Sequence, residues 1–471
     1  MDIKKGKYRI YILILILCFV LCLIAVNEKE KMISMYELGI EKMENQEYQE
    51  AQEILRELGD YKDCLNQIEI ATNSITYEKA IELFNEGKFE QAIKEFSQIQ
   101  TFQDSQKYIE RAKEQIEQIN TNEKEYDEAV KSYNSSEYID AIQKFSDLSN
   151  YKDSQELLRE CRKKLARLQQ AKTISAGIRY SVGVINDGRI EYSGDYSVLE
   201  KELSRWEDII SISIKGNLGI GLKEDGTVVT AGKVPDYPDY YLDTKSWEDI
   251  IAISSGQQYV VALKADGTLR AQGHNGDGQV DIDEWEDIIA ISTGWRHTVG
   301  IDSKGNIYIT GYGSKKQLQQ IERQKDKWTD IIAISAGGGS HTEEGKLPYT
   351  VGLKQDGTVV TTQTGVIADE ISKWTDVVAI SAGDFHIVGL KKDGSVVSTA
   401  TTSSADDVNG WSDIVAISAG YGFTLGLKSD GTVVATGFSK NKQINIEEWE
   451  IIKTYKEEWE SIFDRNLRWT L

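Results

Sequence analysis

One sequence motif is repeated seven times between Thr173 and Trp449. Each copy contains an Ile-Ser-x-Gly step or a close variant, an apolar segment, a turn with glycine, a second apolar segment and a closing tryptophan. Neighbouring closing tryptophans are 37 to 46 residues apart, near the period expected for propeller blades. These residues are Trp206, Trp247, Trp285, Trp328, Trp374, Trp411 and Trp449. The repeat predicts an all-β propeller with seven blades over residues 172–452, followed by a C-terminal tail over residues 453–471.

The residue types within each copy suit a propeller blade. Ala-Ile-Ser-Ala-Gly, as at residues 333–337, is a strand of small residues that fits the crowded region near a propeller axis. Asp-Gly pairs then predict two-residue hairpins of type I′, in which both central residues have positive φ. The aspartates are Asp187, Asp225, Asp266, Asp356, Asp393 and Asp430, and Lys304-Gly305 replaces the pair once. We interpret them as turn residues and not as ligands.

The N-terminal region predicts one membrane helix. Residues 10–26 form an uncharged apolar run of seventeen residues, at the short end of what spans a bilayer. Four basic residues precede this run, so the positive-inside rule places residues 1–9 in the cytoplasm and the rest of the chain outside the membrane. We expect a signal anchor. Cleavage after Ala25 is the alternative, although a polar, small-residue cleavage region is missing.

A second repeat, with helical spacing, occupies residues 36–171. Its copies begin at Tyr36, Tyr77 and Tyr126, and small and large apolar residues follow at intervals of three and four. This spacing predicts pairs of amphipathic helices that bury their faces against neighbouring pairs. Residues 115–124 lie between the second and third copies and, without Pro or Gly, predict an extended helix. The array suits either a peptide groove or a spacer, and we favour the spacer.

This helical repeat resembles the tetratricopeptide family over residues 36–164. The family's closing proline is replaced by Tyr61-Lys62-Asp63, Phe102-Gln103-Asp104 and Tyr151-Lys152-Asp153. The resemblance implies an α-helical repeat stalk, and three copies meet the usual minimum for stability. A basic helix follows over residues 156–171, where a contact with an anionic lipid or polymer is possible, but we favour a solvated face. Its cations are Arg159, Arg162, Lys163, Lys164 and Arg167.

The β repeat resembles the regulator of chromosome condensation family of seven-bladed propellers. The match is strongest in Gly-Trp-Arg-His-Thr at residues 294–298 and in Gly-His-Asn-Gly-Asp-Gly-Gln at residues 273–279. The resemblance implies the fold, whereas function does not follow from fold alone. The founding member is a nucleotide-exchange factor for a nuclear small GTPase, and secreted relatives clamp β-lactamases through one propeller face. The predicted topology of this chain matches the secreted kind.

Composition and spacing argue against several function classes. The formal net charge of −22 disfavours nucleic acid, whose affinity depends on basic residues that neutralise phosphates. Cys64 and Cys161 lack the spacing of a metal site or a disulfide framework, and residues 275–283 lack the final glutamate of a calcium loop. His297 and His386 occupy a position that other copies fill with Tyr, Leu or Phe, which indicates packing. We therefore expect no enzyme activity, cofactor or metal.

Variation among the copies concentrates on one predicted face, which combines the turns after Ile-Ser-x-Gly with the loops before each tryptophan. Trp, Tyr and Arg, which dominate binding hot spots, gather there, together with Asp384. The alternative is that these aromatic residues only cap the blades. The predicted binding residues are Arg179, Tyr237, Tyr240, Tyr241, Trp295, Arg296, Phe385 and Tyr421.

These features together predict a membrane-anchored, extracytoplasmic protein-binding scaffold that recognises a partner protein through this face. A cell-wall or carbohydrate-binding protein is the first alternative, because the same aromatic residues would stack on sugar rings. A nucleotide-exchange regulator is less favoured, since the sequence shows no convergent acid, base or wedge residues.

Overall fold

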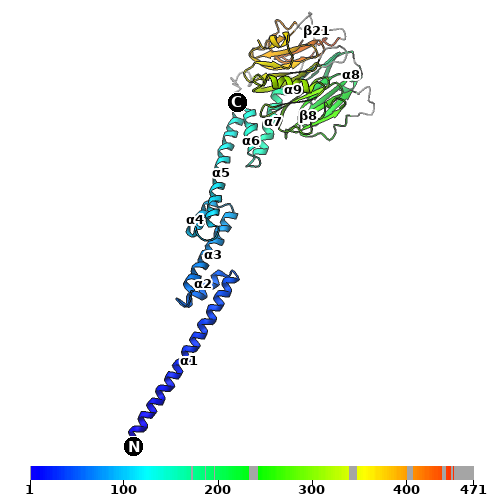
Figure 1. The fold of residues 1–471 in the computed structure, drawn as a ribbon. Helices are drawn as coiled ribbons and strands as arrows, with labels where there is room; N and C mark the ends of the chain where they lie inside the picture. Colours follow the sequence, from blue (N-terminus) through cyan, green and yellow to red (C-terminus); the bar gives the residue numbers. More distant parts are fainter. Residues whose placement is uncertain are drawn as a thin grey trace. The chain divides into compact units, whose positions relative to one another are not determined.

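The computed structural model describes residues 2–170, 173–185, 187–195, 197–232, 242–338, 347–399, 407–437, 442–446 and 449 (Figure 1). The chain divides into two compact units, Met1–Lys124 and Glu125–Leu471. The boundary falls within helix α5 (Ser105–Asn134), which contains the residues 115–124 that were predicted to extend a helix. The third copy of the helical repeat therefore belongs to the second unit, and the predicted C-terminal tail lies outside the described residues.

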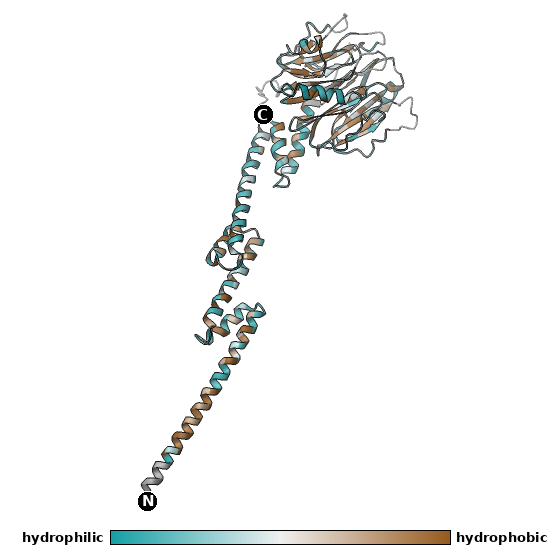
Figure 2. Cartoon of the chain, viewed as in Figure 1, coloured by the Kyte–Doolittle hydropathy of each residue, from teal (hydrophilic) through white to brown (hydrophobic). Residues whose placement is uncertain are grey.

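The first unit is helical. The long helix α1 (Asp2–Glu44) contains the apolar stretch that Figure 2 shows in brown. The side chains of this stretch are exposed, and the helix meets the length and composition of a membrane span. The helix continues without a break into the first repeat copy, so the predicted span and Tyr36 share one helix. The helices of this unit before α5 are α1 (Asp2–Glu44), α2 (Tyr48–Glu57), α3 (Cys64–Asn85), α4 (Phe89–Phe96) and the 3-10 helix η1 (Ser97–Ile99).

Small residues in these helices allow large ones to pack closely, as their spacing predicts. A Cβ on Gly39 of α1 would lie 2.8 Å from a methyl carbon of Leu55 in α2, so only glycine lets these helices approach so closely. In the second copy, Ala80, Ala92 and Phe96 are fully buried in one cluster. The predicted burial of one face of each helix is confirmed at these positions.

The Tyr-Lys-Asp segments make a recurring local contact. The Tyr36 hydroxyl donates a hydrogen bond of 2.5 Å to Asp63, and the Lys62 ammonium lies 3.9 Å from the centre of the Tyr36 ring. Tyr126 donates in the same way to Asp153 in the third copy. Lys62 has a φ of +50°, so a left-handed residue makes the turn for which proline would be unsuitable.

The second unit contains seven three-stranded antiparallel sheets among its described residues, and each sheet is built from consecutive strands. Sheets 1 and 2 are β1 (Ile174–Ala176), β2 (Tyr180–Val184), β3 (Ile190–Gly194) and β4 (Ile209–Lys215), β5 (Leu218–Lys223), β6 (Val228–Gly232). Sheets 3 and 4 are β7 (Ile250–Ser255), β8 (Tyr259–Lys264), β9 (Leu269–Gly273) and β10 (Ile288–Thr293), β11 (His297–Asp302), β12 (Ile307–Gly311).

Sheets 5, 6 and 7 complete the set and follow the same order. They are β13 (Ile331–Gly337), β14 (Tyr349–Lys354), β15 (Val359–Thr361); β16 (Val377–Ala382), β17 (Ile387–Lys391), β18 (Val396–Ser398); and β19 (Ile414–Ala419), β20 (Phe423–Lys428), β21 (Val433–Gly437). Short helices lie in three of the connections between sheets, namely α8 (Ser197–Leu203), α9 (Ser314–Arg323) and α10 (Val366–Ile371). We call the first, second and third strand of each sheet inner, middle and outer.

The serines of the Ile-Ser-x-Gly steps connect neighbouring sheets. Each hydroxyl oxygen accepts a hydrogen bond of 2.9 to 3.1 Å from a backbone N–H of the adjacent inner strand. The pairs, with the N–H donor first, are Ile214 with Ser175, Ser255 with Ser213, Thr293 with Ser254, Ala336 with Ser292, Ala382 with Ser335, Ala419 with Ser381 and Ala176 with Ser418. Because the last pair joins sheet 7 to sheet 1, the sheets form a closed ring.

The chain beyond sheet 7 also packs against sheet 1. The Ser181 hydroxyl of β2 donates a hydrogen bond of 2.5 Å to the carbonyl of Gln443, and Ser193 of β3 donates to Lys442 at 2.7 Å. Trp449 lies in one hydrophobic cluster with Ile174 of β1. The seventh tryptophan therefore closes the ring against the first sheet.

The Asp-Gly turns differ from the predicted type I′. In the turn after β5, Gly226 has a φ of +80° whereas Asp225 is not among the residues with positive φ. The N–H of Gly226 donates to the carbonyl of Lys223, and the Asp225 carboxylate accepts the N–H of Thr227 at 2.9 Å. The connection is therefore a three-residue hairpin loop in which only the glycine has a left-handed conformation. The hydrogen bond of the aspartate side chain favours a negative φ at the aspartate itself. The assignment of these aspartates to turns is confirmed.

The glycines in the middle strands make room for the repeated tryptophans. A Cβ on Gly300 of β11 would lie 2.8 Å from the Trp285 ring, and Gly221 meets Trp206 at the same distance. Trp285 is 9% exposed. Each of these tryptophans follows one sheet in the sequence and packs on the middle strand of the next, so it covers the joint between two sheets.

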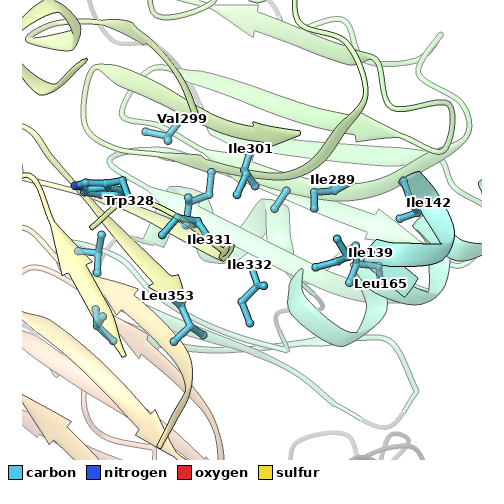
Figure 3. Close-up of a cluster of buried hydrophobic side chains, with 14 of the residues drawn as sticks. Ile139, Ile142, Leu165, Ile289, Val299, Ile301, Trp328, Ile331, Ile332 and Leu353 are labelled. Atoms are coloured by element: carbon cyan, nitrogen blue, oxygen red, sulfur yellow. The ribbon is translucent and has the colours of Figure 1, made fainter. Parts of the chain in front are cut away.

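Helices α6 (Tyr138–Asp147) and α7 (Ser154–Gln170) pack against the ends of the sheets that carry the Asp-Gly turns, which we call the hairpin face. Ile139, Ile142 and Leu165 share one hydrophobic core with Ile289 and Ile332 of the sheets (Figure 3). The third helical pair is therefore part of the same folded unit as the sheets.

Polar contacts fix the same docking. Arg162 of α7 is 5% exposed and forms an ion pair with Asp287, and the Gln143 amide of α6 donates to the carbonyl of Ser303 at 2.5 Å. The prediction that the basic residues of this helix form a solvated face is wrong for Arg162. Burial of a guanidinium requires a paired carboxylate, which the turn beside β10 supplies.

Candidate functional site

The opposite ends of the sheets carry the turns between inner and middle strands, and we call them the loop face. Phe385 in the turn of sheet 6 and Tyr421 in the turn of sheet 7 form an edge-to-face pair, with ring centres 4.6 Å apart and planes at 77°. Both residues are half-buried. The Tyr421 N–H donates to the carbonyl of Gly177 in sheet 1, and exposed Arg179 follows in that turn. Predicted binding residues from three successive sheets are thus neighbours.

Two other predicted binding residues are engaged in packing. Trp295 is only 6% exposed, so it offers little contact area to a partner in this structure. The Arg296 guanidinium donates to Asp277 at 2.5 Å and lies 4.7 Å from the centre of the Tyr312 ring. Both residues therefore fit the alternative, in which loop-face residues cap the sheets. Tyr237, Tyr240 and Tyr241 lie outside the described residues.

A cavity with a volume of about 350 Å³ runs along the centre of the ring. The seven serines of the inner strands line it. Lys215, Asp384 and Tyr421 border it toward the loop face, and Asp356 and Leu168 border it toward the hairpin face. The small residues of the Ile-Ser-x-Gly steps thus leave open space at the axis.

An ion pair crosses the loop-face end of this cavity. The Lys215 ammonium of sheet 2 lies 3.8 Å from a carboxylate oxygen of Asp384 in sheet 6, and their side chains are 16% and 3% exposed. Lys215 takes the place of the glycine in the Ile-Ser-x-Gly step, as comparison with Gly177 and Gly383 shows. The sequence analysis missed Lys215, although this break in the repeat was the signal that marks it.

The two histidines at the repeated packing position are buried. Burial, together with the positive charge of Lys215, lowers the pKa of His297 to about 3, so its ring is neutral at physiological pH. A ring nitrogen of His386 lies 2.8 Å from the Thr424 hydroxyl of sheet 7. In sheet 3 the same position is Tyr259, whose hydroxyl donates to the His297 carbonyl at 2.6 Å. The His386 ring thus links sheets 6 and 7, whereas the bond from Tyr259 reaches the backbone of His297 and not its ring.

Residues 288–317 and 414–443 match the family model described as the Regulator of chromosome condensation (RCC1) repeat. The closed ring of sheets and these matches define a protein with RCC1-like β-propeller repeats, as the sequence predicts. No curated protein matches the chain. Among the described residues, no group of three or more His, Cys, Asp or Glu residues is placed to hold a metal ion.

Several solved structures are similar to this chain. The ectodomain of the Arabidopsis thaliana receptor kinase ACR4 is 17% identical, with 59% of this chain and 99% of that chain covered and a TM-score of 0.45. Prp20p from Saccharomyces cerevisiae is 14% identical, with 62% and 87% covered and a TM-score of 0.41. The ectodomain of the Physcomitrella patens receptor kinase CR4 is also 14% identical, with 57% and 74% covered and a TM-score of 0.40.

Proposed function

We propose that this chain is a membrane-anchored, extracytoplasmic scaffold that binds a partner protein through the loop face of a seven-bladed propeller. In this proposal each three-stranded sheet is one blade, α1 is a signal anchor, and the tetratricopeptide-like helices space the propeller from the membrane. The chain acts as a binding protein and not as an enzyme.

The aromatic pair of Phe385 and Tyr421 is the observation that carries this proposal. Two half-buried rings that pack against one another form a rigid apolar surface, and aromatic side chains lose little conformational entropy on binding. Arg179 adds an exposed guanidinium from the neighbouring turn. Aromatic residues and arginine at the centre of a surface are the residue types that dominate protein-binding hot spots.

Helices α6 and α7 cover part of the hairpin face, which supports the same choice of surface. Helices α6 and α7 bury apolar residues such as Ile289 and Ile332 on that side of the sheets. A partner that approaches the second unit at sheets 4 and 5 of the hairpin face would have to displace this core. The loop face has no such cover among the described residues, so we assign partner binding to it.

Substitution of the aromatic pair tests the proposal. The wild-type chain, solubilised with its membrane helix, is used to capture a protein from the cells of origin, which is then identified by mass spectrometry. F385A together with Y421A should reduce capture of that protein at least tenfold, while the thermal midpoint stays close to that of the wild type. E224A, in an exposed hairpin turn, serves as the matched control and should leave capture unchanged.

Two outcomes would reject protein recognition by this surface. If the double variant captures the protein as well as the wild type does, the aromatic pair has no part in binding. If the double variant loses stability together with capture, the two rings are packing residues. Binding of the wild type to cell-wall glycans, lost in the same variant, would instead support the carbohydrate-binding alternative.

A further inference from the structure

The central cavity has the composition of a ligand site and not only of a packing void. Close-packed interiors leave few voids larger than a water molecule, and those that stay empty are lined by apolar groups. The cavity of about 350 Å³ is instead lined by seven serine hydroxyls and reached by a charged pair. Its size lies at the lower end of the range for small-molecule sites.

The serine hydroxyls offer hydrogen-bond donors to the cavity. Each of these oxygens accepts a backbone N–H, as Ser175 does from Ile214 and Ser335 does from Ala382. A hydroxyl that accepts through its oxygen still carries one O–H donor that can rotate. These hydroxyls can therefore donate to a ligand that accepts hydrogen bonds, except that of Ser254, which lies 2.8 Å from the Thr293 hydroxyl.

Lys215 supplies the positive charge for such a ligand. The other six copies all have glycine at this position, as Gly177, Gly337 and Gly420 show, so only sheet 2 contributes a long side chain to the cavity from this position. Its 3.8 Å separation from Asp384 exceeds hydrogen-bond distance, and an ammonium group has three donors. The ammonium can thus bind a third group without leaving Asp384.

The access to a cation differs between the two ends of the cavity. Charges of both signs offset one another at the hairpin-face end, where the charged lining residues are Asp356, Asp376, Lys354 and Lys392. At the loop-face end Lys215 is more exposed than Asp384, so a ligand arriving from that side meets the ammonium first. Tyr421 borders the same end and offers an apolar ring beside the charge.

The geometry points to a binding site for a small organic carboxylate at the loop-face end of the central cavity, held by the Lys215 ammonium and the serine hydroxyls of the inner strands. A charge-assisted hydrogen bond from the ammonium supplies most of the affinity. The hydroxyls bind the polar atoms of the ligand body. Tyr421 borders this site and also belongs to the aromatic pair proposed for partner binding, but the charge of the ligand is bound by Lys215, which lies outside that pair.

Calorimetric titration of the full-length chain in detergent tests this inference. The probes are acetate, succinate and benzoate, with glucose and choline as the neutral and cationic comparisons. At least one carboxylate should bind the wild type with a dissociation constant in the millimolar range or tighter, while glucose and choline should not bind. The absence of binding by all three carboxylates at millimolar concentration would overturn the inference.

Variants at the ion pair separate this site from other surfaces. K215G restores the glycine of the repeat, and K215M keeps the length of the side chain without its charge, so a folding defect in one variant does not end the test. Both should weaken carboxylate binding at least tenfold. D384N removes the competing negative charge and should tighten the binding. Carboxylate binding that survives in both Lys215 variants would contradict the assignment.

Discussion

The Ser418 hydroxyl oxygen accepts a hydrogen bond of 2.9 Å from the backbone N–H of Ala176, a residue that lies 242 positions earlier in the chain. The same contact joins sheets that are adjacent in sequence, for example Ser335 with Ala382. Among the described residues every sheet is built from consecutive strands, so the contact between sheets 7 and 1 closes the ring there without an exchanged strand.

Loss of the closing hydroxyl should destabilise the ring. S418A leaves the Ala176 N–H without its acceptor, which costs about 1 to 3 kcal/mol for a buried donor. S335A removes the equivalent contact between sheets 5 and 6 and should cost a similar amount. Urea unfolding of both variants measures the two costs. If S418A unfolds with the free energy of the wild type while S335A is destabilised, the ring is not closed by this contact.

The docking of α7 should depend on one arginine. R162M keeps the aliphatic stem but leaves the Asp287 carboxylate without its cation. We expect a loss of about 2 kcal/mol, below the value for fully buried pairs because the Asp287 side chain is 28% exposed. The pair of Arg159 and Asp249 is half exposed, so R159M should change the stability by less than about 0.5 kcal/mol.

Chemical denaturation with limited proteolysis measures both docking variants. Proteolysis of R162M should cleave between α6 and the sheets faster than in the wild type, because the helical pair detaches more often. Equal losses in R162M and R159M would show that the docking relies on the apolar core alone.

His297 should make the fold sensitive to acid. Its folded-state pKa of about 3 lies below the ordinary value of 6.5, so the unfolded chain takes up the proton first as the pH falls. Stability from this group is therefore present above pH 6.5 and decreases as the pH is lowered toward 3. Sheets 1, 3 and 5 carry tyrosine at this position. The variant H297Y should therefore lose less folding stability than the wild type as the pH is lowered.

The unfolding midpoint in urea, measured at pH 7 and at pH 4.5 for both proteins, tests this prediction. Other groups that titrate over this interval contribute nearly equally to wild type and variant, so the difference between the two proteins isolates His297. An identical change of the midpoint in both proteins would contradict it.

The proposed orientation in the membrane predicts which residues an external reagent reaches. Cys64 and Cys161 are fully buried, and burial raises the pKa of the Cys161 thiol to about 12, so both should react slowly with maleimides. An E224C variant carries an exposed thiol in a hairpin turn. A membrane-impermeant maleimide should label E224C in intact cells well above the wild-type background. Labelling only after lysis would contradict the extracytoplasmic placement.

The repeat made most of the β architecture predictable. Identical constraints recur in seven copies, so a residue such as Trp285 and its glycine partner Gly300 can be interpreted from any one of them. The turn type was predicted wrongly, because Asp-Gly suits two kinds of hairpin and the choice depends on whether the aspartate side chain accepts a backbone N–H, as Asp225 does.

The parts that the sequence did not predict depend on contacts between distant segments. The basic residues of α7 are typical of a solvated face, and only the docked structure shows Arg162 opposite Asp287. Aromatic residues on the loop face could not be sorted by type alone, since Trp295 is buried whereas Phe385 is half-buried. Lys215 was not predicted because the residue types of binding hot spots, Trp, Tyr and Arg, do not include lysine, although it replaces the glycine of the repeat.

Site-specific photo-crosslinking tests the central claim most directly, because it reports which face of the protein touches a partner in the cell. A photoreactive amino acid is placed at Arg179, Phe385 or Tyr421 on the loop face, and at Glu224 or Ser429 on the hairpin face. The loop-face positions should give one common adduct protein, and the hairpin-face positions should not. Adducts of the same protein only from Glu224 or Ser429 would contradict recognition through the loop face.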